Sequence, residues 1–95
     1  MGKSKKLFSH FLRKKPTKIL INLNKNDKIK YASVIAKEVD CTYSHTVRIL
    51  NTMEKNNLVK FDKKGRLKTI TLTATGKKIS EHLEKVVNLF NKVEN

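Results

Sequence analysis

Four side chains between positions 44 and 51 have the types and the spacing that suit contact with the base edges of a nucleic acid. They are Ser44, Val47, Arg48 and Asn51, which lie at i, i+3, i+4 and i+7 and therefore share one face if the segment is helical. An arginine can bond O6 and N7 of guanine, an asparagine can pair with adenine, a serine can bond either base, and a valine can touch the thymine methyl group. Taken alone, the pattern fits an ordinary solvated helix face equally well.

The residues around the start of this stripe are suited to phosphate. Thr42 and Tyr43 stand at the expected N-terminus of the helix, where free backbone N–H groups favour anions, and His45 lies between the two helix faces. Cys41 and His45 are too few to form the ligand set of a structural zinc site. We therefore expect no metal, and we place Cys41 in the packing of the turn.

The charge of the chain points to the same class of partner. Its 95 residues include 22 Lys and Arg against 8 Asp and Glu, which gives a formal net charge of +14 and a pI near 10.1. Such a field favours polyanions. The sequence contains no glycine-rich phosphate loop, no paired carboxylates in an apolar setting and no Ser-His-Asp spacing, so we expect neither an enzyme nor a cofactor.

The length allows one hydrophobic core, and the single cysteine cannot form an internal disulfide. No apolar run approaches the roughly 20 residues that span a bilayer, so we expect a cytoplasmic, nucleoid-associated protein without membrane contact. Residues 1–15 form a basic arm, whose apolar side chains would share one face of a short helix: Leu7, Phe8, Phe11 and Leu12. This arm leaves open a different class of function, a module that binds a membrane surface or another protein.

Apolar spacing predicts three helices before residue 58. The apolar positions are 19, 20 and 23 in the first helix, 32, 35, 36 and 39 in the second, and 46, 49, 50 and 53 in the third. Pro16 suits the first turn of the first helix, and Thr42 can cap the third. The short connection at Asp40 and Cys41 gives the second and third helices the size of a helix-turn-helix.

Two runs with alternating and β-branched residues, 58–61 and 67–72, predict a β-hairpin. The turn between them, 62–66, contains Gly65 and carries Lys63, Lys64 and Arg66. Exposed turns are often rich in lysine, but we favour contact of this turn with a groove of the nucleic acid.

In the last segment, from residue 77, the apolar spacing predicts a helix with a heptad seam. The seam residues are Ile79, Leu83, Val86, Phe90 and Val93. Val87 and Leu89 widen the seam, so that one side can pack on the domain and the other on a second copy. We expect a homodimer held by this helix, with purely intramolecular packing as the alternative.

Helix, helix, turn, helix and hairpin, in this order, is the arrangement of a winged helix. We therefore expect a mostly α fold with a small β-hairpin (α+β): a basic arm at 1–15, a winged helix-turn-helix at 16–76 and a C-terminal dimerisation helix at 77–95. Residues 32–39, 46–50, 53–59 and 72–77 read ASVIAKEV, TVRIL, MEKNNLV and LTATGK. In their order and spacing they resemble the winged-helix core of MarR-type transcriptional regulators.

This resemblance implies that Arg66 enters the minor groove, where an arginine favours narrow A·T tracts. The family usually has glycine where this chain has Asp40 and Asn57, and both of these residues tolerate left-handed backbone. Typical members carry longer terminal helices that build a ligand pocket, so we expect no small-molecule effector here. The compact form also resembles small archaeal winged-helix proteins.

We therefore expect a double-stranded DNA-binding protein, a homodimeric transcriptional regulator with its third helix in the major groove and its wing on the minor groove. The alternative is a less selective, chromatin-like protein, because lysines are many and base-reading side chains are few. RNA binding is disfavoured, since the aromatic residues are scattered along the sequence and form no evident stacking platform.

Overall fold

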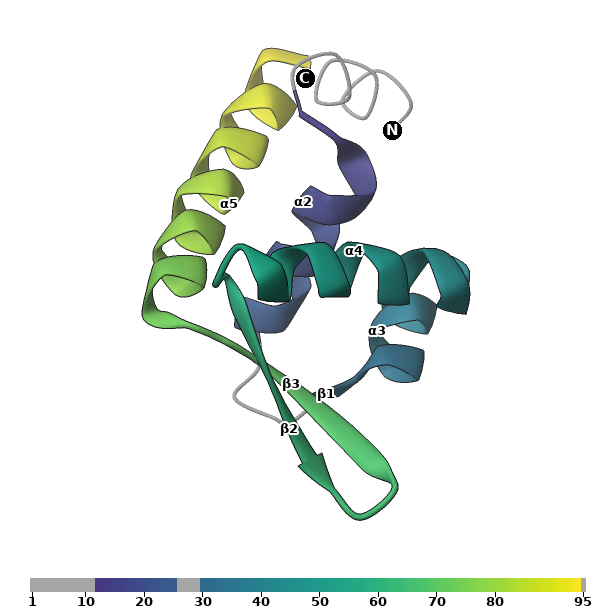
Figure 1. The fold of residues 1–95 in the computed structure, drawn as a ribbon. Coiled ribbons are helices and arrows are strands. Elements are labelled where there is room, and N and C mark those ends of the chain that lie inside the picture. Colours follow the sequence, from purple (N-terminus) through teal and green to yellow (C-terminus); the bar gives the residue numbers. More distant parts are fainter. Residues whose placement is uncertain (1–11, 26–29, 95) are drawn as a thin grey trace.

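A helix-turn-helix pair, a β-hairpin and a long C-terminal helix follow one another in the computed structural model, which describes residues 12–25 and 30–94 (Figure 1). The elements are α2 (Lys14–Lys25), β1 (Lys30–Tyr31), α3 (Ala32–Glu38), α4 (Tyr43–Lys55), β2 (Val59–Lys64), β3 (Leu67–Leu72) and α5 (Ala74–Glu94). The mostly helical α+β class and the winged helix-turn-helix order are confirmed. The short helix expected at residues 7–12 falls, except for Leu12, outside the described residues.

The apolar positions that predicted the three helices meet in one core. Ile19 of α2, Ile35 of α3 and Leu50 of α4 are almost completely buried. The remaining buried members of the cluster are Leu20, Leu23, Val39, Met53, Val59 and Ile70. Burying these side chains is the main force that fixes the three helices against the hairpin. α5 packs along α2, where the buried hydroxyl of Ser80 donates to the carbonyl oxygen of Leu20 at 2.8 Å.

The sheet has one strand more than the sequence predicts. Its order is β1-β3-β2, with antiparallel pairing throughout, and β1 pairs Lys30 with Ile70 and Tyr31 with Thr69. A strand of two residues has no periodicity, so only its pairing with β3 reveals it. The predicted turn at 62–66 is also too long, because β2 continues to Lys64 and leaves a two-residue turn at Gly65, whose φ is 63°. The last residues of β2 are polar and exposed, so they lack the apolar pattern by which a strand is recognised in a sequence.

The left-handed positions expected at Asp40 and Asn57 are confirmed, with φ of 56° and 64°. In both turns the next residue donates its N–H to the carbonyl five residues back, at 2.8 Å after Asp40 and 2.9 Å after Asn57. Each left-handed residue also donates its own N–H to the carbonyl three residues back. This pair of bonds is the Schellman motif, which satisfies the free carbonyls at the ends of α3 and α4.

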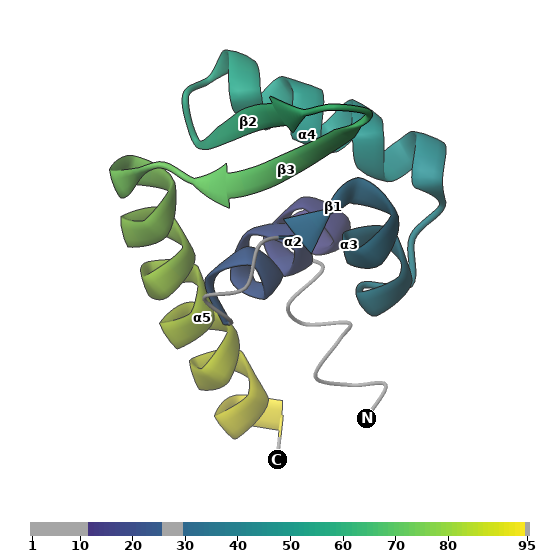
Figure 2. The same ribbon diagram turned by 90° about the horizontal axis from the view of Figure 1, so that it is seen from below.

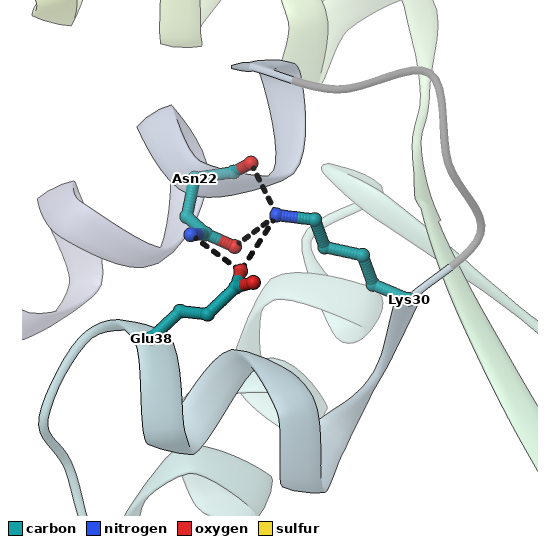
Figure 3. Close-up of polar contacts among 3 residues, drawn as sticks. All are labelled: Asn22, Lys30 and Glu38. Atoms are coloured by element: carbon teal, nitrogen blue, oxygen red, sulfur yellow. Dashed lines mark hydrogen bonds and ion pairs between the residues drawn. The ribbon is translucent and has the colours of Figure 1, made fainter.

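Lys30 ties β1 to the helices on either side of it (Figure 3). Its side chain is only about 5% exposed, and its ammonium donates to Asn22 O (3.0 Å), Asn22 Oδ1 (2.7 Å) and Glu38 Oε1 (2.9 Å). The amide of Asn22 donates to the same carboxylate oxygen at 3.0 Å. The bond from Lys30, and after it the bond from Asn22, lowers the pKa of Glu38, so this carboxylate stays ionised at neutral pH. All three N–H groups of a buried charge are thus satisfied, and the start of α3 is held in place.

Candidate nucleic-acid interface

The two faces of α4 divide as the sequence predicts. Thr46, Leu50 and Met53 are buried against the core. On the opposite face Ser44, Arg48 and Asn51 are exposed, and Val47 is half-buried. Because the core fixes one face of α4, the other presents two hydrogen-bonding side chains and a guanidinium in a fixed row.

The N-terminus of α4 holds the residues expected at phosphate. The hydroxyl oxygen of Thr42 accepts from the His45 N–H at 3.2 Å, so Thr42 is the predicted cap. Thr42 and His45 are both exposed, and Tyr43 is 61% exposed. Three exposed side chains that can form hydrogen bonds therefore lie around the start of α4.

The wing presents its charges to solvent. Lys63, Lys64 and Arg66 are all exposed around the turn at Gly65. A further cation, Lys68, lies with its Nζ 4.3 Å from the centroid of the Phe61 ring, and this contact holds the ammonium on the face of the hairpin next to α4. Sequence reasoning missed Lys68, because only the strand register brings it beside Phe61.

A hollow of about 420 Å³ lies between α4 and the hairpin. It brings together five of the predicted contact residues: Tyr43, Val47, Asn51, Lys63 and Arg66. The other five, Thr42, Ser44, His45, Arg48 and Lys64, do not line it. Tyr31, Ser33 and Lys68 line it too, and the sequence offered no sign of the first two. Tyr31 reaches the hollow through the pairing of β1 with β3, and Ser33 follows it in the first turn of α3. Among the described residues, its lining contains no acidic side chain.

The members of the predicted dimer seam on α5 differ in how far they are exposed. Leu83 packs against the core, and Phe90 is half-buried. Val86 and Val93 are 38% and 75% exposed, and Ile79 and Leu89 are exposed beside them. The C-terminal end of α5 lies at one end of the molecule, and α4 with the hairpin lies at the other (Figure 2).

The described segments contain neither a cluster suited to a metal ion nor a helix suited to spanning a membrane. No group of three or more His, Cys, Asp or Glu residues in 12–25 and 30–94 is arranged to hold a metal ion. No helix in the same part of the chain has both the length and the apolar character that a membrane crossing needs.

No protein-family model matches the chain, and no curated protein matches it either. Solved structures do match. AF1382 from Archaeoglobus fulgidus has a TM-score of 0.81 at 24% identity, over 85% of this chain and 92% of that one. The MarR family transcriptional regulator SPO1453 from Silicibacter pomeroyi DSS-3 has a TM-score of 0.74 at 24% identity, over 88% of this chain and 60% of that one.

A third similar structure is MepR, a transcription regulator of the Staphylococcus aureus multidrug efflux pump MepA. Its TM-score is 0.76 at 20% identity, over 97% of this chain and 70% of that one. At these identities the likeness establishes the fold. The chain thus spans most of AF1382 but well under the full length of the two named regulators.

Proposed function

From the winged-helix fold that it shares with MarR family regulators, we propose that this chain binds double-stranded DNA as a homodimeric transcriptional regulator. The observation that carries the proposal is the hollow, where the exposed face of α4 and the basic wing meet and where the described residues include no acidic side chain. Two structures of the same fold are named as transcription regulators, which supports the regulatory role. DNA is then the ligand, in the cytoplasm and on the nucleoid, and no small-molecule effector is required.

In the proposed complex α4 lies in the major groove, which is about 12 Å wide and admits one helix. Arg48 and Asn51 then reach base edges, Ser44 adds a hydroxyl and Val47 an apolar contact. The hairpin extends from the same side of the domain, so Lys63 and Lys64 follow the backbone and Arg66 enters the minor groove. The residues at the start of α4 contact phosphate groups of the DNA: Thr42, Tyr43 and His45.

Arg48→Ala is expected to weaken binding to a preferred duplex by about 1 to 3 kcal/mol and to relax selectivity, because Arg48 stands in the middle of the exposed face of α4. Lys64→Ala is its matched control. Lys64 is an exposed cation of the wing, and its replacement is expected to weaken binding to all duplexes alike. The measurement is the dissociation constant for the preferred duplex and for random duplexes at one salt concentration. Equal losses on both kinds of duplex for Arg48→Ala would favour the chromatin-like alternative.

The homodimer is proposed to form through the exposed stripe on α5, made of Ile79, Val86, Leu89 and Val93. A second copy seated on the C-terminal part of this stripe leaves the opposite end of the molecule free (Figure 2). Both reading helices can then reach one duplex, as a dimeric helix-turn-helix protein requires.

Val86→Lys combined with Val93→Lys is expected to yield a folded monomer, because two charges in an apolar interface oppose association while both positions are exposed in the single chain. Sedimentation velocity measures the mass, and circular dichroism measures the helix content. Leu83 and Phe90 are unsuitable for this test, since they are half-buried within the chain. The control is Asn88→Lys, an added charge at an exposed polar position of the same helix. A double variant that sediments as a dimer would exclude this stripe.

A further inference from the structure

Three aromatic side chains that are distant in sequence meet around the hollow between α4 and the hairpin. They are Tyr31 at the end of β1, Tyr43 in the first turn of α4 and Phe61 in β2. The chain has only two tyrosines, and both are among them. The sequence alone does not bring these three residues together, because the pairing of Tyr31 with Thr69 that carries residue 31 to the hairpin is revealed by no local pattern.

The hollow combines an apolar floor with a cationic rim. Leu50 and Ile70 are buried core residues that also line it, and Val47 is half-buried beside them. The rim carries three exposed cations, Lys63, Arg66 and Lys68. A flat apolar group with a negative charge attached is complementary to such a surface, and a nucleotide unit has this composition.

The exposure of Tyr43 favours an unpaired base over a paired one as the ligand. In a duplex each base is stacked on its neighbours, so that only its edges are open to a protein. An unstacked base offers its whole face to an aromatic ring. Tyr43 is 61% exposed at the border of the hollow, whereas the ring of Phe61 already carries the ammonium of Lys68. Tyr43 is therefore the ring available for stacking, and the rim cations are available for the adjoining phosphates.

We infer that this hollow holds one unpaired nucleotide, so that the protein binds single-stranded DNA with the face that is also proposed to read duplexes. The base stacks on Tyr43 above the floor of Val47 and Leu50, and Arg66 and Lys63 contact the phosphates. The volume of about 420 Å³ suits one such unit, since sites for small ligands begin near 300 Å³.

Two substitutions of Tyr43 separate stacking from hydrogen bonding. Tyr43→Phe keeps the ring and removes the hydroxyl, whereas Tyr43→Leu removes both. A phosphate contact through the hydroxyl, as proposed for duplex DNA, is lost equally in the two variants. Stacking is lost only in Tyr43→Leu. The side chain is mostly exposed, so neither variant should disturb the core.

The test measures binding of a fluorescent oligothymidylate, and of a duplex of the same length, to the full chain at one salt concentration. For the single strand, Tyr43→Leu is expected to weaken binding about tenfold and Tyr43→Phe by less than about twofold. Equal affinities of the two variants for the single strand would overturn the inference, because charge alone would then explain binding. A single strand carrying 5-iodouracil should crosslink to Tyr43 on irradiation, and crosslinks confined to residues outside the hollow would also overturn it.

The inference and the proposed function can fail separately. Binding of oligothymidylate that depends on the Tyr43 ring, without binding of the duplex, would remove the duplex proposal and support the single-strand site. Duplex binding accompanied by no affinity for oligothymidylate would overturn the single-strand site alone.

Discussion

Affinity for a DNA duplex is expected to fall by about three to five decades when the salt concentration rises from 50 to 200 mM. The proposed interface carries five exposed cations in each subunit: Arg48, Lys63, Lys64, Arg66 and Lys68. A dimer therefore neutralises on the order of 6 to 10 phosphates, and each neutralised phosphate contributes about −0.9 to the slope of log K against log salt. The measurement is a titration of a labelled duplex at several salt concentrations.

Single-site variants show whether the slope arises from the proposed face. Lys64→Ala is expected to flatten the slope by about one unit for each subunit that uses this contact. The control is Lys85→Ala, which removes an exposed cation from α5, away from the hairpin, and should leave the slope unchanged. A slope near zero for the unaltered protein would exclude DNA phosphate as its main ligand.

Gly76→Ala is expected to destabilise the fold by about 3 kcal/mol or more. Gly76 lies in the first turn of α5, and a Cβ at this position would overlap the backbone carbonyl oxygen of Leu58 and lie 2.9 Å from its carbonyl carbon. The gain in helix propensity from alanine, about 1 kcal/mol, is too small to offset this overlap. Backbone cannot move aside as a flexible side chain can, so the start of α5 must shift.

The contact at Gly76 is fixed by Thr73, which joins the end of α4 to the start of α5. Its N–H donates to Leu58 O at 3.0 Å, and its hydroxyl donates to Asn57 O at 2.8 Å while accepting from the Gly76 N–H at 3.0 Å. Urea unfolding at one protein concentration measures the loss. Lys77→Ala, at an exposed position in the same turn, serves as the control and should change stability little. A Gly76→Ala protein as stable as its parent would mean that this close approach is not needed.

The sequence predicts those parts of the fold that depend on local chemistry. The stripes around Ile35 and Leu50 predict α3 and α4, because a helix must bury one face to be stable. Thr42 predicts the start of α4, and Asp40 predicts the left-handed turn before it, because each acts through its own neighbours in the chain. The apolar stripe of α4 also predicts its exposed face, because the residues opposite the buried ones must point to solvent.

The parts that escaped prediction depend on contacts between distant segments. β1 exists only through its pairing with β3, and the position of Tyr31 at the hollow follows from the same pairing. The partners of Lys30 come from α2 and α3, and no spacing in the sequence joins them. The sequence predicts that one side of the α5 seam packs on the domain, but its heptad spacing did not show which members would turn toward α2 and the core.

Selection of binding sites from random duplexes, followed by footprinting of the selected DNA, tests most directly whether α4 reads sequence in the major groove. The proposed dimer should enrich a motif with two half-sites, their centres about 34 to 36 Å or a multiple of that distance apart. Protection should include the major groove of each half-site and the neighbouring minor groove, where Arg66 is placed. Tight binding without an enriched motif, or a footprint without paired half-sites, would contradict sequence reading by a dimer.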